Sequence, residues 1–210
     1  MVAAGERPLL IFPCNGNGVE ALDCLGEAYR CVGFVDDMPE KQRTGAHGYQ
    51  VFARSVLDER ADAFVLAVPG SPTSYQSRRR IIDGLALGAE RFARVIHPAA
   101  RVSPLATVGR NVLIMSGVVV TSNAIIANHV LIMPNTVIHH DVVIRSWTLI
   151  GSNVTIAGGT SLGANCYIGS GASIMNGLSV GARALVGMGS NVVRNVPAGA
   201  RVAGNPARPI

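Results

Sequence analysis

Residues 135–159 read NTVIHHDVVIRSWTLIGSNVTIAGG, and this stretch decides the fold. Its aliphatic residues Ile138, Ile144, Ile150 and Ile156 recur at every sixth position. A helix repeats at about 3.6 residues, and the side chains of an ordinary strand alternate with a period of two. Because neither element produces a period of six, the stretch belongs to a repeat of another kind.

The repeat extends far beyond this stretch. Every sixth residue from Val102 to Val192 is aliphatic, sixteen positions in all. A companion residue four positions after each aliphatic one is small or medium-sized, as at Ala106, Val130 and Thr148. Glycine often follows the aliphatic residue in the second half of the array, as in Gly151, Gly163, Gly169, Gly181 and Gly187. Such regularity over almost a hundred residues predicts a solenoid.

The period of six indicates a coil with three flat faces. Each hexad supplies one short strand and one corner, so three hexads close one turn of a triangular prism. The aliphatic residue fills the interior, the small residue packs beside it, and glycine relieves crowding at the corner. Successive turns then stack as parallel strands about 4.8 Å apart. Sixteen hexads make a little over five turns.

The first 98 residues have a different pattern, in which apolar strand-like runs alternate with helical segments. The strand-like runs are PLLIF (8–12), CVGFV (31–35), DAFVLAVP (62–69) and ARVIH (93–97), and the helical segments are residues 15–30 and 71–88. This alternation predicts a small Rossmann-like parallel sheet, with any ligand at the carboxyl ends of its strands. We therefore expect an α/β domain over 1–98 and the prism over 99–210.

The first loop of the α/β domain contains a glycine pattern. Gly16, Asn17 and Gly18 begin a match to G-x-G-x-x-G/A, and Asp36 follows about 20 residues later. A domain of this length is too short for the paired halves that bind a whole dinucleotide. We therefore expect a nucleotide or nucleotide sugar, with backbone N–H groups facing phosphate and Asp36 or Asp37 facing base or ribose. A plain βα turn would also explain the glycines.

Composition and charge narrow the function classes. Charged residues are only 15% of the chain, against about a quarter in average proteins, which favours strands and self-association. The net charge of +5 suits anionic small molecules. Only Arg78, Arg79 and Arg80 form a basic run, which a solvated helix face explains, so we expect no nucleic-acid partner.

Cysteines and hydropathy bear on location. Cys14, Cys24, Cys31 and Cys166 form no CxxC pair and no regular framework, so we expect reduced thiols in a cytoplasmic protein. The first residues, MVAAGERPLLIF, lack the features of a signal peptide. No apolar run reaches the ~18 residues that would span a bilayer, so we expect no membrane insertion.

The hexad array resembles the hexapeptide-repeat acyltransferases, whose fold is a left-handed parallel β-helix. With the preceding α/β domain, residues Leu9 to Ile210 resemble the bacterial sugar acetyltransferases that include sialic acid O-acetyltransferases and nucleotide-amino-sugar N-acetyltransferases. The resemblance supplies the handedness of the coil. It also implies a homotrimer, with acetyl-CoA lying in the groove between neighbouring prisms.

The resemblance assigns chemistry to the triplet His139-His140-Asp141. His140 matches the family's catalytic histidine, which stands in an EHE or EHD triplet, and is expected to act as general base while Asp141 orients its ring. Residues 18 apart share a corner, so Gly158 stacks on His140 and leaves room for a ligand. His139 replaces an acidic residue and is expected at the rim of the substrate site.

The resemblance also implies binding residues. Asn15, Gly16 and Asn17 match the first substrate loop, Asp36 and Asp37 the family's DD pair, and Pro69 or Gly70 the loop after the third strand. Gly158, Ser170, Gly187 and Met188 match positions along the acetyl-CoA groove, and Arg201 and Arg208 are candidates for CoA phosphates. This chain departs from the family at Pro13 and Asn17, where a glycine and a histidine are usual, and at Leu149, Met133 and Pro134.

Our leading hypothesis is therefore acetyl transfer from acetyl-CoA to the amine of a nucleotide-linked sugar, without a metal. Transfer to a hydroxyl, as in sialic acid O-acetylation, is a close alternative. A zinc enzyme resembling the β-helical carbonic anhydrases would need His129, His139 and His140 on one metal ion. We expect His129 instead at the surface or a subunit interface. A non-catalytic trimer that senses nucleotides is the third class.

Overall fold

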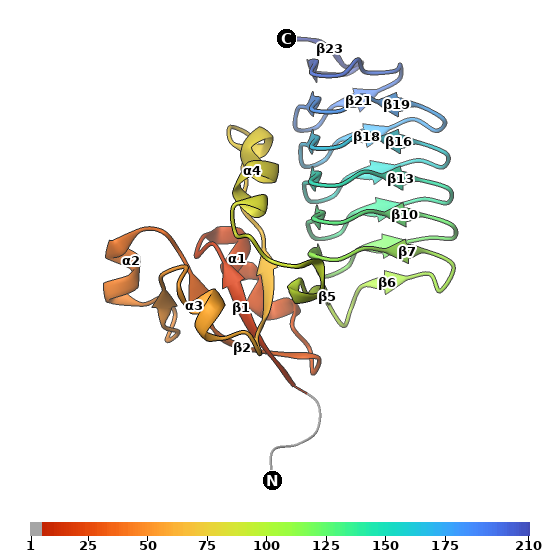
Figure 1. Ribbon diagram of the computed structural model, residues 1–210. Helices are drawn as coiled ribbons and strands as arrows, with labels where there is room; N and C mark the ends of the chain where they lie inside the picture. Colours follow the sequence, from red (N-terminus) through yellow and green to blue (C-terminus); the bar gives the residue numbers. More distant parts are fainter. Residues whose placement is uncertain (1–5) are drawn as a thin grey trace.

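The computed structural model describes residues 6–210, which form a small α/β unit beside a tall stack of triangular coils (Figure 1). The small unit contains β1 (Arg7–Phe12), α1 (Gly16–Glu20), β2 (Tyr29–Val35), α2 (Pro39–Thr44), β3 (Val51–Phe52), α3 (Val56–Glu59), β4 (Phe64–Ala67) and α4 (Arg78–Asp83), with 3-10 turns η1 (Ala21–Cys24), η2 (Tyr75–Ser77) and η3 (Ala89–Arg91). No helix within residues 6–210 has the length and apolar character needed to cross a membrane.

The small sheet has the strand order β3-β2-β1-β4, and all its paired strands are parallel. Three of the predicted strands, PLLIF, CVGFV and DAFVLAVP, are confirmed as β1, β2 and β4. Residues 9–11 of β1 are fully buried because the strand is central and both faces of the sheet are covered. The elements between β2 and β4 were not predicted, since a two-residue strand such as β3 leaves no periodic pattern.

The fourth predicted strand, ARVIH, is not part of the small sheet. It forms β5 (Arg94–Ile96), which pairs in parallel with β8 (Val112–Ile114) of the coil stack. The reason is visible in the hexad register, because Ile96 lies six residues before Val102 and joins the same hydrophobic core. The assignment of this strand to the first domain was therefore wrong.

The coil stack is a prism with three sheets as faces. The eight-stranded face contains β5, β8, β11 (Leu131–Ile132), β14 (Leu149–Ile150), β17 (Tyr167–Ile168), β20 (Leu185–Val186), β22 (Arg201–Ala203) and β23 (Arg208–Pro209). The six-stranded face contains β6 (Arg101–Val102), β9 (Val119–Val120), β12 (Val137–Ile138), β15 (Thr155–Ile156), β18 (Ser173–Ile174) and β21 (Asn191–Val192). The five-stranded face contains β7 (Thr107–Val108), β10 (Ile125–Ile126), β13 (Val143–Ile144), β16 (Ser161–Leu162) and β19 (Ser179–Val180).

Residues 18 apart pair across neighbouring coils, as in Val137 with Thr155. The last coil differs, because Leu185 pairs with Arg201, 16 residues later, and because β23 runs antiparallel to β22. The predicted aliphatic column lies inside the prism and forms one continuous hydrophobic core. Buried threonines of the companion column are satisfied within it: the Thr148 hydroxyl donates to Gly163 O and accepts from Cys166 N. The predicted triangular coil is confirmed.

The corners of the prism are columns of stacked turn residues, which we name after one member each. The His140 corner (Ser122, His140, Gly158, Asn176) joins the six- and five-stranded faces. The Ser146 corner (Asn128, Ser146, Ala164, Ala182) joins the five- and eight-stranded faces, and the Ser170 corner (Pro134, Ser152, Ser170, Met188) joins the eight- and six-stranded faces.

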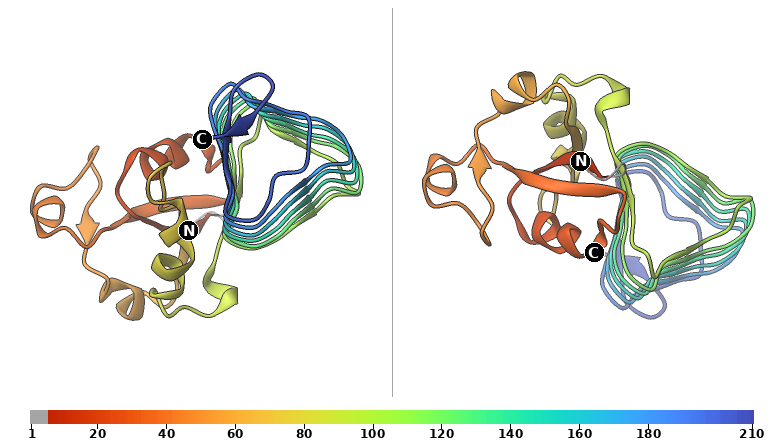
Figure 2. Two further views of the ribbon diagram at one scale, coloured as in Figure 1. Left: turned by 90° about the horizontal axis from the view of Figure 1, so that it is seen from above. Right: turned by 90° about the horizontal axis from the view of Figure 1, so that it is seen from below.

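The small unit covers the eight-stranded face. An outward column of this face, Leu113, Leu131, Leu149, Tyr167 and Leu185, belongs to one hydrophobic cluster with residues of β1, β2 and η1. Figure 2 shows the consequence from above and below: one side of the triangle lies against the small unit, and the opposite vertex points away from it. By its place between the other two faces, the His140 corner is that remote vertex.

A buried arginine joins the two units. Arg78 is only 1% exposed, and its guanidinium donates to the carbonyls of Pro69, His129 and Trp147. The interpretation of the basic run as a solvated helix face was therefore wrong for Arg78, although Arg79 and Arg80 are exposed. The five fixed donors of a guanidinium allow one buried cation to satisfy several carbonyls at once.

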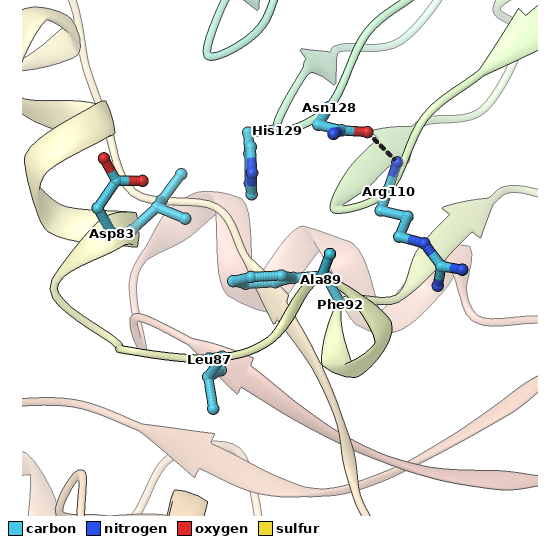
Figure 3. Close-up of a pocket in the computed structure, with 8 residues that line it drawn as sticks. Asp83, Leu87, Ala89, Phe92, Arg110, Asn128 and His129 are labelled. Atoms are coloured by element: carbon cyan, nitrogen blue, oxygen red, sulfur yellow. Dashed lines mark hydrogen bonds between the residues drawn. The ribbon is translucent and has the colours of Figure 1, made fainter.

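His129 also lies at this junction, rather than at the surface or a subunit interface as expected. Its ring stacks on Trp147, with centroids 5.6 Å apart, and meets Phe92 edge-on. Its Nδ1 lies 3.1 Å from Asn111 Nδ2, so the amide donates and the ring proton belongs on Nε2. Figure 3 shows His129 and Phe92 at a small pocket of about 140 Å³ that Asp83 of α4 borders.

We expect acid to destabilise this junction. Burial, and then the nearby Arg78 guanidinium, lower the pKa of His129 from 6.5 to about 4. Between these values the unfolded chain binds a proton that the folded chain does not, so stability falls as the pH drops from 6.5 toward 4. Calorimetry at about pH 7.5 and about pH 5 should show a smaller drop in unfolding temperature for His129→Gln than for the wild type.

The exposed His47 provides the control. A His47→Gln variant should keep the drop of the wild type. An equal drop in all three proteins would contradict this role of His129.

Candidate active site

His140 lies in the turn between β12 and β13, at the corner farthest from the small unit. Its side chain is 62% exposed, and its Nδ1 lies 2.8 Å from Asp141 Oδ2. Asp141 adopts a left-handed backbone conformation, with φ of 58°, which short polar residues tolerate better than most. This turn therefore presents an imidazole to solvent with a carboxylate fixed against one ring nitrogen.

Asn123, one coil earlier, holds the carboxylate in place. Its Nδ2 donates to Asp141 Oδ1 at 3.0 Å. The hydrogen bond from His140, and then the one from Asn123, lower the pKa of Asp141, so the carboxylate stays ionised at neutral pH. An ionised carboxylate only accepts hydrogen bonds, which puts the imidazole proton on Nδ1 and leaves the Nε2 lone pair free.

Sequence analysis missed Asn123. The signal was present, because Asn123 lies 18 residues before Asp141 and therefore stacks beneath it. Asn123 belongs to the column through Asp141, which is adjacent to the column through His140.

Gly158 provides the surface on which the imidazole rests. A Cβ atom at Gly158 would lie 2.5 Å from Nε2 and 2.6 Å from Cε1 of His140. Any side chain at this position would therefore displace the ring. Gly159 N donates to His140 O, whereas Gly158 N makes no hydrogen bond within residues 6–210. The predicted stacking of Gly158 on His140 is confirmed, and its amide is free for a ligand.

His139 is half-buried, and its backbone N–H is used in the ladder to Ile156 O. Its imidazole makes no hydrogen bond to any residue from 6 to 210. A role at the substrate rim stays a prediction.

The residues expected to bind acetyl-CoA lie around the six-stranded face and the last coils. Ser170 and Met188 stand on the Ser170 corner, which bounds this face opposite the His140 corner with Gly158. Gly187 precedes Met188, whose side chain is 73% exposed, and Ser170 Oγ accepts from Ser152 N. Arg208 lies in β23 and is exposed. The structure thus places most of these residues along one face, and their role stays a prediction.

The residues expected to bind the nucleotide sugar meet at the carboxyl ends of β1, β2 and β4. Asn15 caps α1, with its side chain accepting from Gly18 N. Asn17 Nδ2 donates to the carbonyls of Val68 and Gly70, on either side of Pro69. A Cβ at Gly16 would meet nothing within 4 Å, so the loop is open to solvent there.

The two aspartates after β2 have different surroundings. Asp36 is 4% exposed and accepts from Cys14 N, Met38 N and Lys41 Nζ, so it braces the first loop. Direct contact of Asp36 with a ligand would require some of these bonds to be exchanged. Asp37 is exposed and forms a bidentate pair with Arg54. Its side chain is the more accessible of the two.

One chain does not bring His140 and the small-unit loops together. The loops belong to the small unit, which packs against the eight-stranded face, and the His140 corner is the vertex opposite that face (Figure 2). His129, His139 and His140 do not converge either, because His129 lies beside the Ser146 corner and stacks on Trp147. Within residues 6–210, no three His, Cys, Asp or Glu side chains are grouped to hold a metal ion. Within one chain, the three histidines named for the zinc alternative therefore do not form a common site.

Comparison with known families and structures agrees with this geometry. Residues 123–158 match the bacterial transferase hexapeptide (six repeats) family. Sequence comparison with curated proteins gives no significant match. The matched residues include Asn123, His140, Asp141 and Gly158.

Solved structures match over almost the whole chain. The protein is similar to the acetyltransferase domain of PglB from Neisseria gonorrhoeae FA1090, solved with acetyl coenzyme A, at 26% identity over 98% of this chain and 100% of that one, with a TM-score of 0.86. PerB from Caulobacter crescentus, solved with CoA and GDP-perosamine, is 25% identical over 99% of this chain and 98% of the PerB chain, with a TM-score of 0.82. WeeI from Acinetobacter baumannii AYE, at 23% identity over 98% and 100% with a TM-score of 0.81, shares the fold.

These likenesses confirm the expected fold class, a small parallel α/β unit followed by a left-handed parallel β-helix. They also confirm the resemblance to sugar acetyltransferases. The same Caulobacter enzyme, a perosamine N-acetyltransferase, has been solved with one histidine replaced by asparagine or alanine.

We expect a Gly158→Ala substitution to displace His140. The contact of 2.5 Å between the new Cβ and Nε2 must open to about 3.5 Å, the usual separation of non-bonded atoms. A crystal structure of the variant should therefore show the ring shifted by about 1 Å or more, with its hydrogen bond to Asp141 lengthened. A ring in the original position would contradict the stacking described above. Ala182→Ser, at an exposed position of the Ser146 corner, should leave His140 unmoved.

Proposed function

We propose that the protein is an acetyl-CoA-dependent N-acetyltransferase that acts on the amine of a nucleotide-linked amino sugar. The observation that carries this proposal is the His140–Asp141 pair resting on Gly158, because Asp141 takes the N–H of a neutral imidazole on Nδ1 and leaves Nε2 as an acceptor beside an unbonded backbone amide. The likeness to PglB and PerB supports the reaction class.

His140 serves as general base. The neutral sugar amine attacks the thioester carbonyl of acetyl-CoA and forms the new C–N bond. Nε2 of His140 accepts the proton that the amine nitrogen loses, and Asp141 stabilises the resulting imidazolium through Nδ1. The C–S bond then breaks, and the imidazolium returns the proton to the departing CoA sulfur. The base is thereby restored, and the products are the N-acetyl sugar and CoA.

The acetyl-CoA co-substrate lies along the six-stranded face in this proposal. Gly158, Ser170, Gly187 and Met188 line its pantetheine arm, and Arg208 meets its phosphates. The unbonded Gly158 amide donates to the carbonyl oxygen as negative charge develops there. Small side chains at three of these positions keep the main chain within reach of the ligand.

The acceptor sugar is held by its nucleotide in the small unit. The loops of Asn15–Asn17, Asp36–Asp37 and Pro69 form the nucleotide site, and His139 stands at the sugar end beside the base. The four cysteines are buried and free, which suits a cytoplasmic enzyme. In this proposal, the acetylated product enters the synthesis of a bacterial surface polysaccharide.

Catalysis requires a homotrimer in this proposal. The nucleotide loops and His140 lie on opposite sides of one chain, so an acceptor bound to one subunit meets the base of a neighbour. A closed ring of three copies then forms three equivalent sites. Acetyl-CoA occupies the groove between neighbouring prisms.

Replacing the base tests the reaction. We expect His140→Ala to lower kcat by about 10²–10⁴, the usual contribution of a general base, without changing the unfolding temperature. The assay measures CoA release from acetyl-CoA against a panel of UDP-, GDP- and dTDP-linked amino sugars. Unchanged turnover would indicate another base, and no turnover by the wild type with any amine would favour a hydroxyl acceptor or a non-catalytic nucleotide sensor.

Mixing two inactive variants tests the shared site. His140→Ala removes the base, and Gly16→Trp fills the open first loop. If each site takes its base and its nucleotide loops from different subunits, randomly mixed trimers should regain about a quarter of the wild-type activity. If one chain supplied both parts, co-expression would restore nothing. Light scattering of the wild type should give the mass of three chains.

A further inference from the structure

The eight-stranded face ends in an arginine where its apolar column stops. In this face, Leu149 pairs with Tyr167, Tyr167 with Leu185, and Leu185 with Arg201 of β22. The residues below Arg201 are buried under the small unit, whereas Arg201 itself is exposed. Arg201 is therefore the first residue above this buried column whose side chain the small unit leaves exposed.

A groove of about 330 Å³ lies at this height between the two units. Pro72, Thr73, Tyr75 and Gln76 line it from the small unit, and Leu185 and Arg201 line it from the prism. Its wall is fixed, because Tyr75 OH donates to Arg183 O and Gln76 O accepts from Asn165 Nδ2. Figure 1 shows α4, which follows this segment, beside the upper coils.

The groove suits an anion. None of its lining residues is acidic, and the Arg201 guanidinium forms no ion pair or hydrogen bond with another residue in the 6–210 range. The segment that lines it begins just after Pro69 and Gly70, the loop at the carboxyl end of β4. A ligand bound at the carboxyl ends of the small sheet would therefore extend directly toward Arg201.

We propose that Arg201 binds the phosphates of the nucleotide-linked sugar, so that the prism of the same chain completes the nucleotide site. This inference rests on the proposed function and revises the expectation that Arg201 meets CoA phosphates. Gly158, Ser170 and Met188 stand on the two corners that bound the six-stranded face, whereas Arg201 lines the groove beside the small unit. A planar guanidinium matches phosphate oxygens two at a time.

Kinetics of an Arg201→Gln variant test the assignment. We expect KM for the nucleotide amino sugar to rise roughly tenfold, as for loss of one charge-assisted hydrogen bond, with kcat and KM for acetyl-CoA unchanged. Arg201→Lys keeps the charge but loses the planar guanidinium, so its KM for the nucleotide amino sugar should lie between the values of the wild type and of Arg201→Gln. Arg30→Gln, which removes an exposed charge from the amino end of β2, should match the wild type.

Direct binding measurements distinguish contacts to the phosphates from contacts to the rest of the ligand. By calorimetry, Arg201→Gln should weaken binding of a nucleoside diphosphate roughly tenfold and leave binding of the bare nucleoside unchanged. A rise in KM for acetyl-CoA instead would return Arg201 to the CoA site. No change in either KM would indicate that Arg201 is an ordinary surface charge. Wild-type protein that binds nucleotide but acetylates nothing would defeat the proposed reaction and leave this inference standing.

Discussion

The parallel hydrogen-bond ladder between coils is the constraint on which the rest of the structure depends. Val143 N donates to Thr160 O at 3.0 Å, and His139 N donates to Ile156 O at 3.0 Å, so each coil is held in register by the next. Because coils advance by 18 residues, every side chain stands directly over another. Asp141 over Asn123 and His140 beneath Gly158 are products of this register. The contacts around His140 and Asp141 therefore depend on the register of the neighbouring coils.

The same register explains how the small unit is attached. The outward column of the eight-stranded face is apolar from Leu113 to Leu185, so it must be covered. Arg78 adds polar contacts, because its guanidinium donates to Pro69 O in the loop after β4 and to two carbonyls of the prism. Asn17 holds Val68 and Gly70 on either side of that bond. Three successive carbonyls after β4 are thus held by side chains, which makes the loop rigid before any ligand arrives.

Periodic features could be predicted from sequence, and features that depend on contact between the units could not. The hexads predicted the coils from Val102 to Val192 but neither β5 nor the β22–β23 end, and the 18-residue spacing predicted Gly158 over His140. Arg78 looked like one of three solvated arginines, although its spacing from Tyr75 and Ile82, both buried, marks the inner face of the segment. His129 looked exposed because a corner position says nothing about the small unit packed against it. The proposed place of Arg201 at the nucleotide phosphates rests on the groove beside it, which no sequence pattern predicts.

The reversed direction of β23 has a consequence beyond the site. A stack of short parallel strands presents, at its last coil, the same unpaired edge that any further coil would use, and such edges promote assembly into fibres. Here β23 pairs antiparallel to β22, while Ala207 N donates to Asn191 O and Asn191 N donates to Gly204 O. The chain thereby covers the free edge of β22 with its own antiparallel strand, to which a further parallel coil cannot be added in the same way. The prism ends as a discrete particle rather than as the seed of a filament.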